Sequence, residues 1–180
     1  MQSNTERAND LPSIHKCRDL WDKYKMPENI RAHTLSVARF ADAVAAHLTA
    51  QGIAVDKELV NRGALLHDIA KLRGIQGGKD VHHTDEGAAI LGEEGWGGRL
   101  ADVVRYHGTE DFSFALPIED QIVNYADRRV VHDKIVSLEE RLADLAKRYP
   151  GAREIIEEKR PLYAEFEERY ESHKIEGIVS

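Results

Sequence analysis

The sequence lacks the features that mark secreted and membrane proteins. Its only cysteine is Cys17, so an internal disulfide is excluded, and so is a metal site built from several thiolates. No run approaches the ~20 apolar residues of a membrane span. Residues 1–10 lack the apolar core of a signal peptide. These absences predict a cytoplasmic protein with no membrane contact.

Acidic residues outnumber basic residues in the sequence. The formal net charge is −7 at pH 7, which argues against a surface that coats a nucleic acid polymer. A local cationic pocket for a small anionic ligand is compatible with that charge. The composition therefore favours a small substrate over a polymeric one.

Runs typical of β-strands are scarce, whereas glutamate and alanine are abundant, so we predict an all-α fold. The length of 180 residues suits one compact domain. We expect a disordered tail over residues 1–10 and a single domain over 11–180. Apolar spacing, caps and breakers predict about seven to nine helices. They are expected over residues 11–25, 27–51, 56–71, 84–91, 99–107, 117–134 and from 137 onwards, with a tail from residue 152 that Pro161 breaks or kinks.

Several ionisable residues fall on the apolar sides of these helices. His33 and His107 have apolar neighbours three and four residues away, and so does Asp127. His67 and Asp68 end an apolar run. One inward histidine alone is more often a hydrogen-bonded core residue than a ligand. Together, however, these groups are best satisfied by one cluster of divalent metal ions.

Two other patterns imitate functional motifs. The doublet His132-Asp133 lies in a charged segment, so we predict that it is exposed surface. The segment GIQGGKD, residues 74–80, lacks the first glycine and the Ser/Thr of a phosphate-binding P-loop. We expect it to be a flexible loop after the third helix.

The order His33, HDIAK, HHTDEGA, RYH and YADRR resembles the HD superfamily of metal-dependent phosphohydrolases. The resemblance spans roughly residues 28–149. It is greatest to the small bacterial HDIG-related group, from which this chain departs by having Ala70 in place of glycine. The resemblance implies an HD-type helical bundle.

It also implies a set of metal ligands. One divalent metal is expected on His33, His67, Asp68 and Asp127. Members with two further histidines hold a second metal that the doublet aspartate bridges; here these would be His83 and His107. The neighbouring His82 is an alternative that spacing alone does not exclude, and the family pattern favours His83. Nitrogen and oxygen donors suit iron, manganese, cobalt, nickel or zinc, and the resemblance favours iron or manganese.

The implied chemistry is hydrolysis of a phosphate ester or anhydride of a small nucleotide-like substrate by a hydroxide that bridges the metals. Asp68 would bridge the metals and orient the hydroxide. Lys71 shares its helical face and would contact the phosphate; at most one of Arg128 and Arg129 would reach in, and Arg128 is the candidate. The alternatives are a di-iron oxygenase with the same ligands and a silent ligand-binding module.

Specificity and assembly have no readable code in the sequence. Substrate selectivity is expected to come from the loops at residues 73–82 and 108–117. The aromatic residues of the tail would either close the core or form a dimer surface, so the protein is expected to be a monomer or a homodimer.

Overall fold

The computed structural model describes residues 11–77 and 82–178, and it confirms an all-α fold. The predicted tail at residues 1–10 lies outside the described residues, as do residues 78–81 of the predicted loop. The helices are α1 (Ile14–Lys23), α2 (Glu28–Ala50), α3 (Lys57–Leu66), α4 (Lys71–Gly77), α5 (His83–Glu93), α6 (Arg99–Arg105), α7 (Ile118–Asp127), α8 (Leu138–Arg148) and α9 (Arg153–Arg169). No helix of the described segments is both long and apolar enough to cross a membrane.

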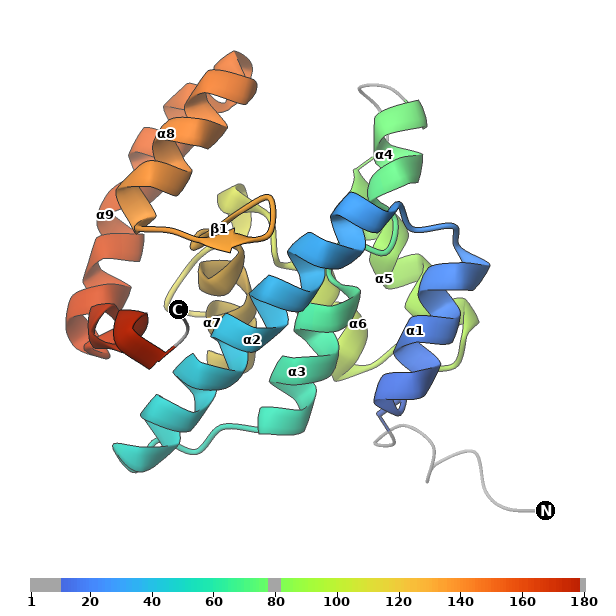
Figure 1. Ribbon diagram of the computed structural model, residues 1–180, viewed down its shortest axis with the longest axis horizontal. Helices are drawn as coiled ribbons and strands as arrows, with labels where there is room; N and C mark the ends of the chain where they lie inside the picture. Colours follow the sequence, from blue (N-terminus) through green and yellow to red (C-terminus); the bar gives the residue numbers. More distant parts are fainter. Residues whose placement is uncertain (1–10, 78–81, 179–180) are drawn as a thin grey trace.

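Helix α2 is the centre of the molecule (Figure 1). It packs against α3 and α7, while α5 packs on α6 and α8 packs on α9. Its predicted apolar stripe is fully buried at Val37, Phe40, Val44 and Leu48. Burying a side chain the size of Phe40 stabilises the fold by about 1.5–3 kcal/mol. The stripe therefore fixes the faces of α2 that meet its two neighbours.

Local capping follows the sequence at several helix ends. The side chain of Asp56 accepts a hydrogen bond from the Leu59 N–H and starts α3. The predicted capping box of Ser137 and Glu140 is present at the start of α8. Thr84 does not cap α5, because that helix begins at His83 with His82 as its N-cap.

The third helix ends earlier than predicted. α3 stops at Leu66 and the short helix α4 occupies Lys71–Gly77, part of the segment that we expected to be a flexible loop. His67 and Asp68 therefore lie in a turn between two helices and not inside one. Ile14, the first residue of α1, is 45% exposed although it is apolar.

The C-terminal part differs from the predicted helices at two places. The helix expected over residues 117–134 ends at Asp127, and a hairpin of β1 (Val130–Val131) and β2 (Lys134–Ile135) follows. Adjacent β-branched residues favour such an extended pair. Pro161 does not end α9, which continues to Arg169. Pro161 lies on the exposed face of α9, where water can satisfy the carbonyl that loses its helical donor.

A close approach of α3 to α6 makes Gly63 a sensitive position. A Cβ at Gly63 would overlap Val103 Cγ1, whereas a Cβ at the exposed Gly92 of α5 would meet nothing within 4 Å. We expect Gly63→Ala to lower the free energy of unfolding by about 1–3 kcal/mol, although alanine is the better helix former. Gly92→Ala is the matched control and should be neutral or stabilising by up to about 1 kcal/mol. Urea unfolding of both variants checks this, and equal effects would contradict the close packing.

Candidate metal centre

Two candidate ligands lie in the turn after α3. His67 and Asp68 follow Leu66 directly. A hydrogen bond of 3.0 Å joins the Ile69 N–H to the Leu66 carbonyl. Another, of 2.9 Å, joins the Lys71 N–H to the Asp68 carbonyl. These tight turns hold both side chains of the doublet in the interior, where His67 is fully buried and Asp68 is 4% exposed.

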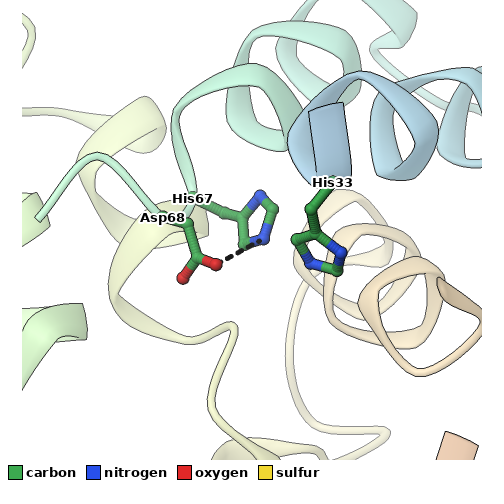
Figure 2. Close-up of side chains that lie close together, drawn as sticks. All are labelled: His33, His67 and Asp68. Carbon is green, nitrogen blue, oxygen red and sulfur yellow. Dashed lines mark ion pairs between the residues drawn. The ribbon is translucent and has the colours of Figure 1, made fainter. Parts of the chain in front are cut away.

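His33 of α2 meets this doublet (Figure 2). One ligand atom from each of His33, His67 and Asp68 lies within 4.8 Å of the others. The His67 Nε2 atom is 3.6 Å from Asp68 Oδ2, and the rings of His33 and His67 meet edge to face at a centroid distance of 5.6 Å. The structure thus brings together three of the predicted ligands, one from α2 and two from the turn after α3.

A second group shares the same aspartate. Asp68 Oδ1 is 3.4 Å from His83 Nε2 and 3.5 Å from His107 Nε2, and the two ring nitrogens are 3.2 Å apart. His83 is the first residue of α5, and His107 follows the end of α6. The neighbouring His82 is exposed, so the geometry favours His83 over His82 as the candidate ligand.

Backbone carbonyls orient three of the histidine rings. The Nδ1 atom of His67 donates to the Ala64 carbonyl over 2.7 Å, and that of His107 donates to the Val104 carbonyl over 2.6 Å. Nδ1 of His33 likewise donates to the His132 carbonyl over 2.8 Å. A ring that donates through Nδ1 turns Nε2 toward its other side as the coordinating atom. All three Nε2 atoms face the carboxylates.

Asp127, the last residue of α7, is held beside His33. Its Oδ1 atom is 2.9 Å from His33 Nε2 and 3.3 Å from Arg141 Nη2. Its Oδ2 atom accepts a hydrogen bond from Arg128 Nη1. Asp127 therefore borders the first group, and two buried arginines balance its charge.

The buried charges perturb one another. Burial lowers the pKa of His67 to about 4, so the ring is neutral at pH 7 and its Nε2 lone pair is free to coordinate. Burial alone would raise the pKa of Asp68, but Lys71 and the surrounding histidines hold it well below its usual range. Burial likewise opposes ionisation of Asp127, whose pKa is held well below its usual range by Arg128, His33 and Arg141. Both carboxylates are ionised at neutral pH.

The donor set fits a divalent metal. His67 Nε2 and Asp68 Oδ1 are buried and have no hydrogen-bond partner within the described residues, an expensive arrangement unless a cation completes it. Imidazole nitrogen and carboxylate oxygen are ligands that iron, manganese, cobalt, nickel and zinc accept. Because Asp68 belongs to both groups, the arrangement suits two metals that share this carboxylate.

The groups open into a cavity of about 620 Å³, within the usual size range of small-molecule sites. Lys71 lines it, with Nζ 3.4 Å from Asp68 Oδ1. Arg128 also lines it, although its guanidinium is engaged by Asp127 and, over 2.9 Å, by the His107 carbonyl. Arg129 points away from the cavity, toward Tyr125 and Glu167.

Sequence reasoning missed Arg141 and the part played by His132. Arg141 of α8 has Leu138 three residues before it and Leu145 four residues after it, and both pack in the core. The spacing that identified Asp127 would therefore have found Arg141 too. His132 is exposed, as predicted for the second doublet, yet its backbone carbonyl orients His33. A backbone contact of this kind leaves no signal in the side-chain pattern.

The chain is similar in sequence to several known proteins. An uncharacterized protein of Methanocaldococcus jannaschii is 31% identical over 147 residues, which cover 72% of this chain and 85% of the relative. The tRNA (cytidine(56)-2'-O)-methyltransferase of Thermoplasma volcanium is 33% identical over 72% of this chain but only 40% of its own length. Ribonuclease Y of Fervidobacterium nodosum is 39% identical over 47% of this chain and 15% of its own length. No solved structure matches.

The family assignment rests on a separate match. Residues 30–130 match the HD domain family. This segment contains all six predicted ligands and both cations, Lys71 and Arg128, whereas α8 and α9 lie beyond it. The narrower resemblance to the HDIG-related group stays a prediction. The chain belongs to the HD superfamily of metal-dependent phosphohydrolases.

Proposed function

We propose that this protein hydrolyses a phosphate ester or anhydride of a small nucleotide-like molecule with the help of two divalent metals. The observation that carries the proposal is that Asp68 belongs to both histidine groups. Its carboxylate lies within 4.8 Å of the ligand nitrogens in each of them. Iron or manganese are the favoured metals, with cobalt, nickel and zinc as alternatives. Bound there, such metals would act as Lewis acids toward phosphoryl oxygens and lower the pKa of the attacking water.

The ligands divide between the two metals. We assign His33, His67, Asp68 and Asp127 to the first metal. His83 and His107 would hold the second metal, to which Asp68 would be a shared ligand. The carbonyl contacts of His33, His67 and His107 support these assignments because they hold the rings in place before any metal arrives.

Asp68 and Lys71 have the catalytic roles. The Asp68 carboxylate accepts the hydrogen bond that orients the attacking water, so its ionised state at neutral pH is required. Lys71 Nζ lies 3.4 Å from this carboxylate and 3.3 Å from His83 Nε2. From there its ammonium would bind the phosphate as a point charge. No serine or cysteine nucleophile is needed.

Arg128 is a weaker candidate for binding substrate. Two of its nitrogens are used by Asp127 and the His107 carbonyl, although Nε is buried without a hydrogen-bond partner in the described part of the chain. We propose that Arg128 holds Asp127 first and adds positive charge to the cavity second.

The test is phosphate release by protein loaded with manganese or iron. The panel holds nucleoside monophosphates, nucleoside polyphosphates, a dinucleoside polyphosphate and a short RNA. The RNA is included because one relative bears the name of a tRNA methyltransferase. We expect metal-dependent release from one or more small substrates and none from the RNA, and release from RNA alone would contradict the substrate class.

Oxygen consumption by the iron-loaded protein is measured in parallel. The same ligands suit a di-iron oxygenase, which would consume oxygen and release no phosphate. A protein that binds metal and does neither would be a silent binding module. Either result would overturn the proposed hydrolysis.

A further inference from the structure

The cavity has a second wall, which differs in chemistry from the metal groups. Its apolar side chains are Ile30 of α2, Leu145 of α8, Ala152 just before α9, and Ile155 and Ile156 in the first turn of α9. Tyr149 follows the last residue of α8, lines the same cavity and is 51% exposed. The cavity lining thus has a charged part, at the ligand groups, and an apolar part, supplied mainly by α8 and α9.

Apart from Ile30, the apolar wall lies outside the segment that matches the HD domain family. That match ends at residue 130, whereas Leu145, Tyr149 and Ile155 all follow it. In Figure 1, α8 and α9 form a pair at one side of the molecule, away from α1, α4 and α5. The segment that supplies the wall is therefore a feature of this chain in addition to the shared ligand set.

The backbone of Tyr149 is fixed. Its N–H donates to the Leu145 carbonyl over 2.8 Å, and its carbonyl accepts from the Ala152 N–H over 2.9 Å. Pro150 follows and restricts the conformation of the residue before it. An aromatic residue that is held in place and exposed beside a cavity is suited to stacking on a flat ring, because little conformational entropy is lost on binding.

The lining also contains the positive charge of Arg148. Arg148 lines the cavity, and its Nε is 2.9 Å from Asp144 Oδ1. Asp144 also accepts a hydrogen bond of 3.2 Å from Arg141, which contacts Asp127. This chain of charges joins the apolar wall to the ligand side of the cavity. A ligand that contacts both parts of the lining would place its phosphate at the histidine and aspartate groups and an aromatic ring at Tyr149.

We propose that Tyr149 is a specificity-determining residue that stacks on the aromatic base of a nucleoside phosphate, with Leu145 and Ile155 lining the base pocket. This assignment rests on the proposed function for the phosphate end of the ligand. It places the source of substrate selectivity in the α8–α9 segment, in addition to the loops at residues 73–82 and 108–117 predicted from the sequence.

The test is a binding measurement that turnover cannot disturb. Manganese-loaded protein is titrated calorimetrically with the 5′-methylenephosphonate analogues of adenosine and of ribose, in which carbon replaces the scissile ester oxygen. We expect the wild type to bind the adenosine analogue about tenfold more tightly, the gain typical of one base stacked on one aromatic ring. Tyr149→Ala should remove most of this preference and leave the ribose analogue unaffected, whereas Tyr149→Phe should retain it.

Ile14→Ala is the control, because Ile14 is another exposed apolar residue and lies on α1, outside the cavity. It should keep the wild-type preference. Equal affinities for the two analogues, no binding of either, or a preference that survives Tyr149→Ala would overturn the base pocket. Phosphate release is assayed separately. A preference for the adenosine analogue without turnover would contradict only the proposed hydrolysis. Turnover without that preference would contradict only the base pocket.

Discussion

Replacing Asp68 with alanine is expected to strip the protein of metal while leaving it folded. Asp68 contributes to both ligand groups, so its loss removes one donor from each. Metal affinity should fall by more than the ~10–100-fold that follows removal of a supporting residue around a metal site, and hydrolysis should be abolished. The helical circular dichroism signal should persist, because the core around Phe40 and Val44 is untouched.

The second doublet supplies the matched control. Asp133 is exposed, and its contact with Ser36 uses its backbone carbonyl, so Asp133→Ala should keep full metal content. His107→Ala gives an intermediate result, since it removes a ligand from the second group only and should lower metal content by about half. Full metal retention in Asp68→Ala would contradict the shared site.

The second large effect is expected at Arg128, as a loss of stability. Its side chain is 5% exposed and pairs with Asp127, which is 9% exposed. Removing one partner of a buried ion pair leaves an uncompensated charge. Arg128→Ala should therefore lower the free energy of unfolding by about 3 kcal/mol, at the low end of the usual range because Arg141 still contacts Asp127. For a chain of this size, that corresponds to a fall in Tm of about 6–12 °C.

This measurement is made on metal-free protein, so that a change in metal binding does not contribute. Arg39 is exposed on α2, and Arg39→Ala is the control, with an expected change within about 0.5 kcal/mol. Unchanged stability in Arg128→Ala together with a raised KM would contradict the supporting role, and would make Arg128 a direct substrate ligand.

The sequence predicted the candidate centre better than it predicted the local structure around it. Inward polar residues identify His33, His107 and Asp127 because such groups need a partner wherever they are buried. The same periodicity could not show that α3 ends at Leu66. Helix ends there depend on how α3 and α6 pack, which is a tertiary effect. The hairpin after Asp127 was missed for a related reason, since two adjacent valines are compatible with either a helix or a short strand.

Other parts of the account depend on contacts that a sequence does not encode. The His132 carbonyl that orients His33 is a backbone group. Tyr149 joins the cavity only because the tertiary fold places the end of α8 at the same cavity as His33 and Asp68. The single domain over residues 11–180, the cytoplasmic location and the choice between monomer and homodimer stay predictions from composition and pattern.

The most direct test of the central claim is the metal content of the wild-type chain. Protein purified without chelator, then equilibrated with manganese or iron under exclusion of oxygen and desalted, is analysed for metal per chain by mass spectrometry. The account predicts about two ions per chain, one for each of the histidine groups that share Asp68. A chain that retains no metal after loading with either ion would contradict it.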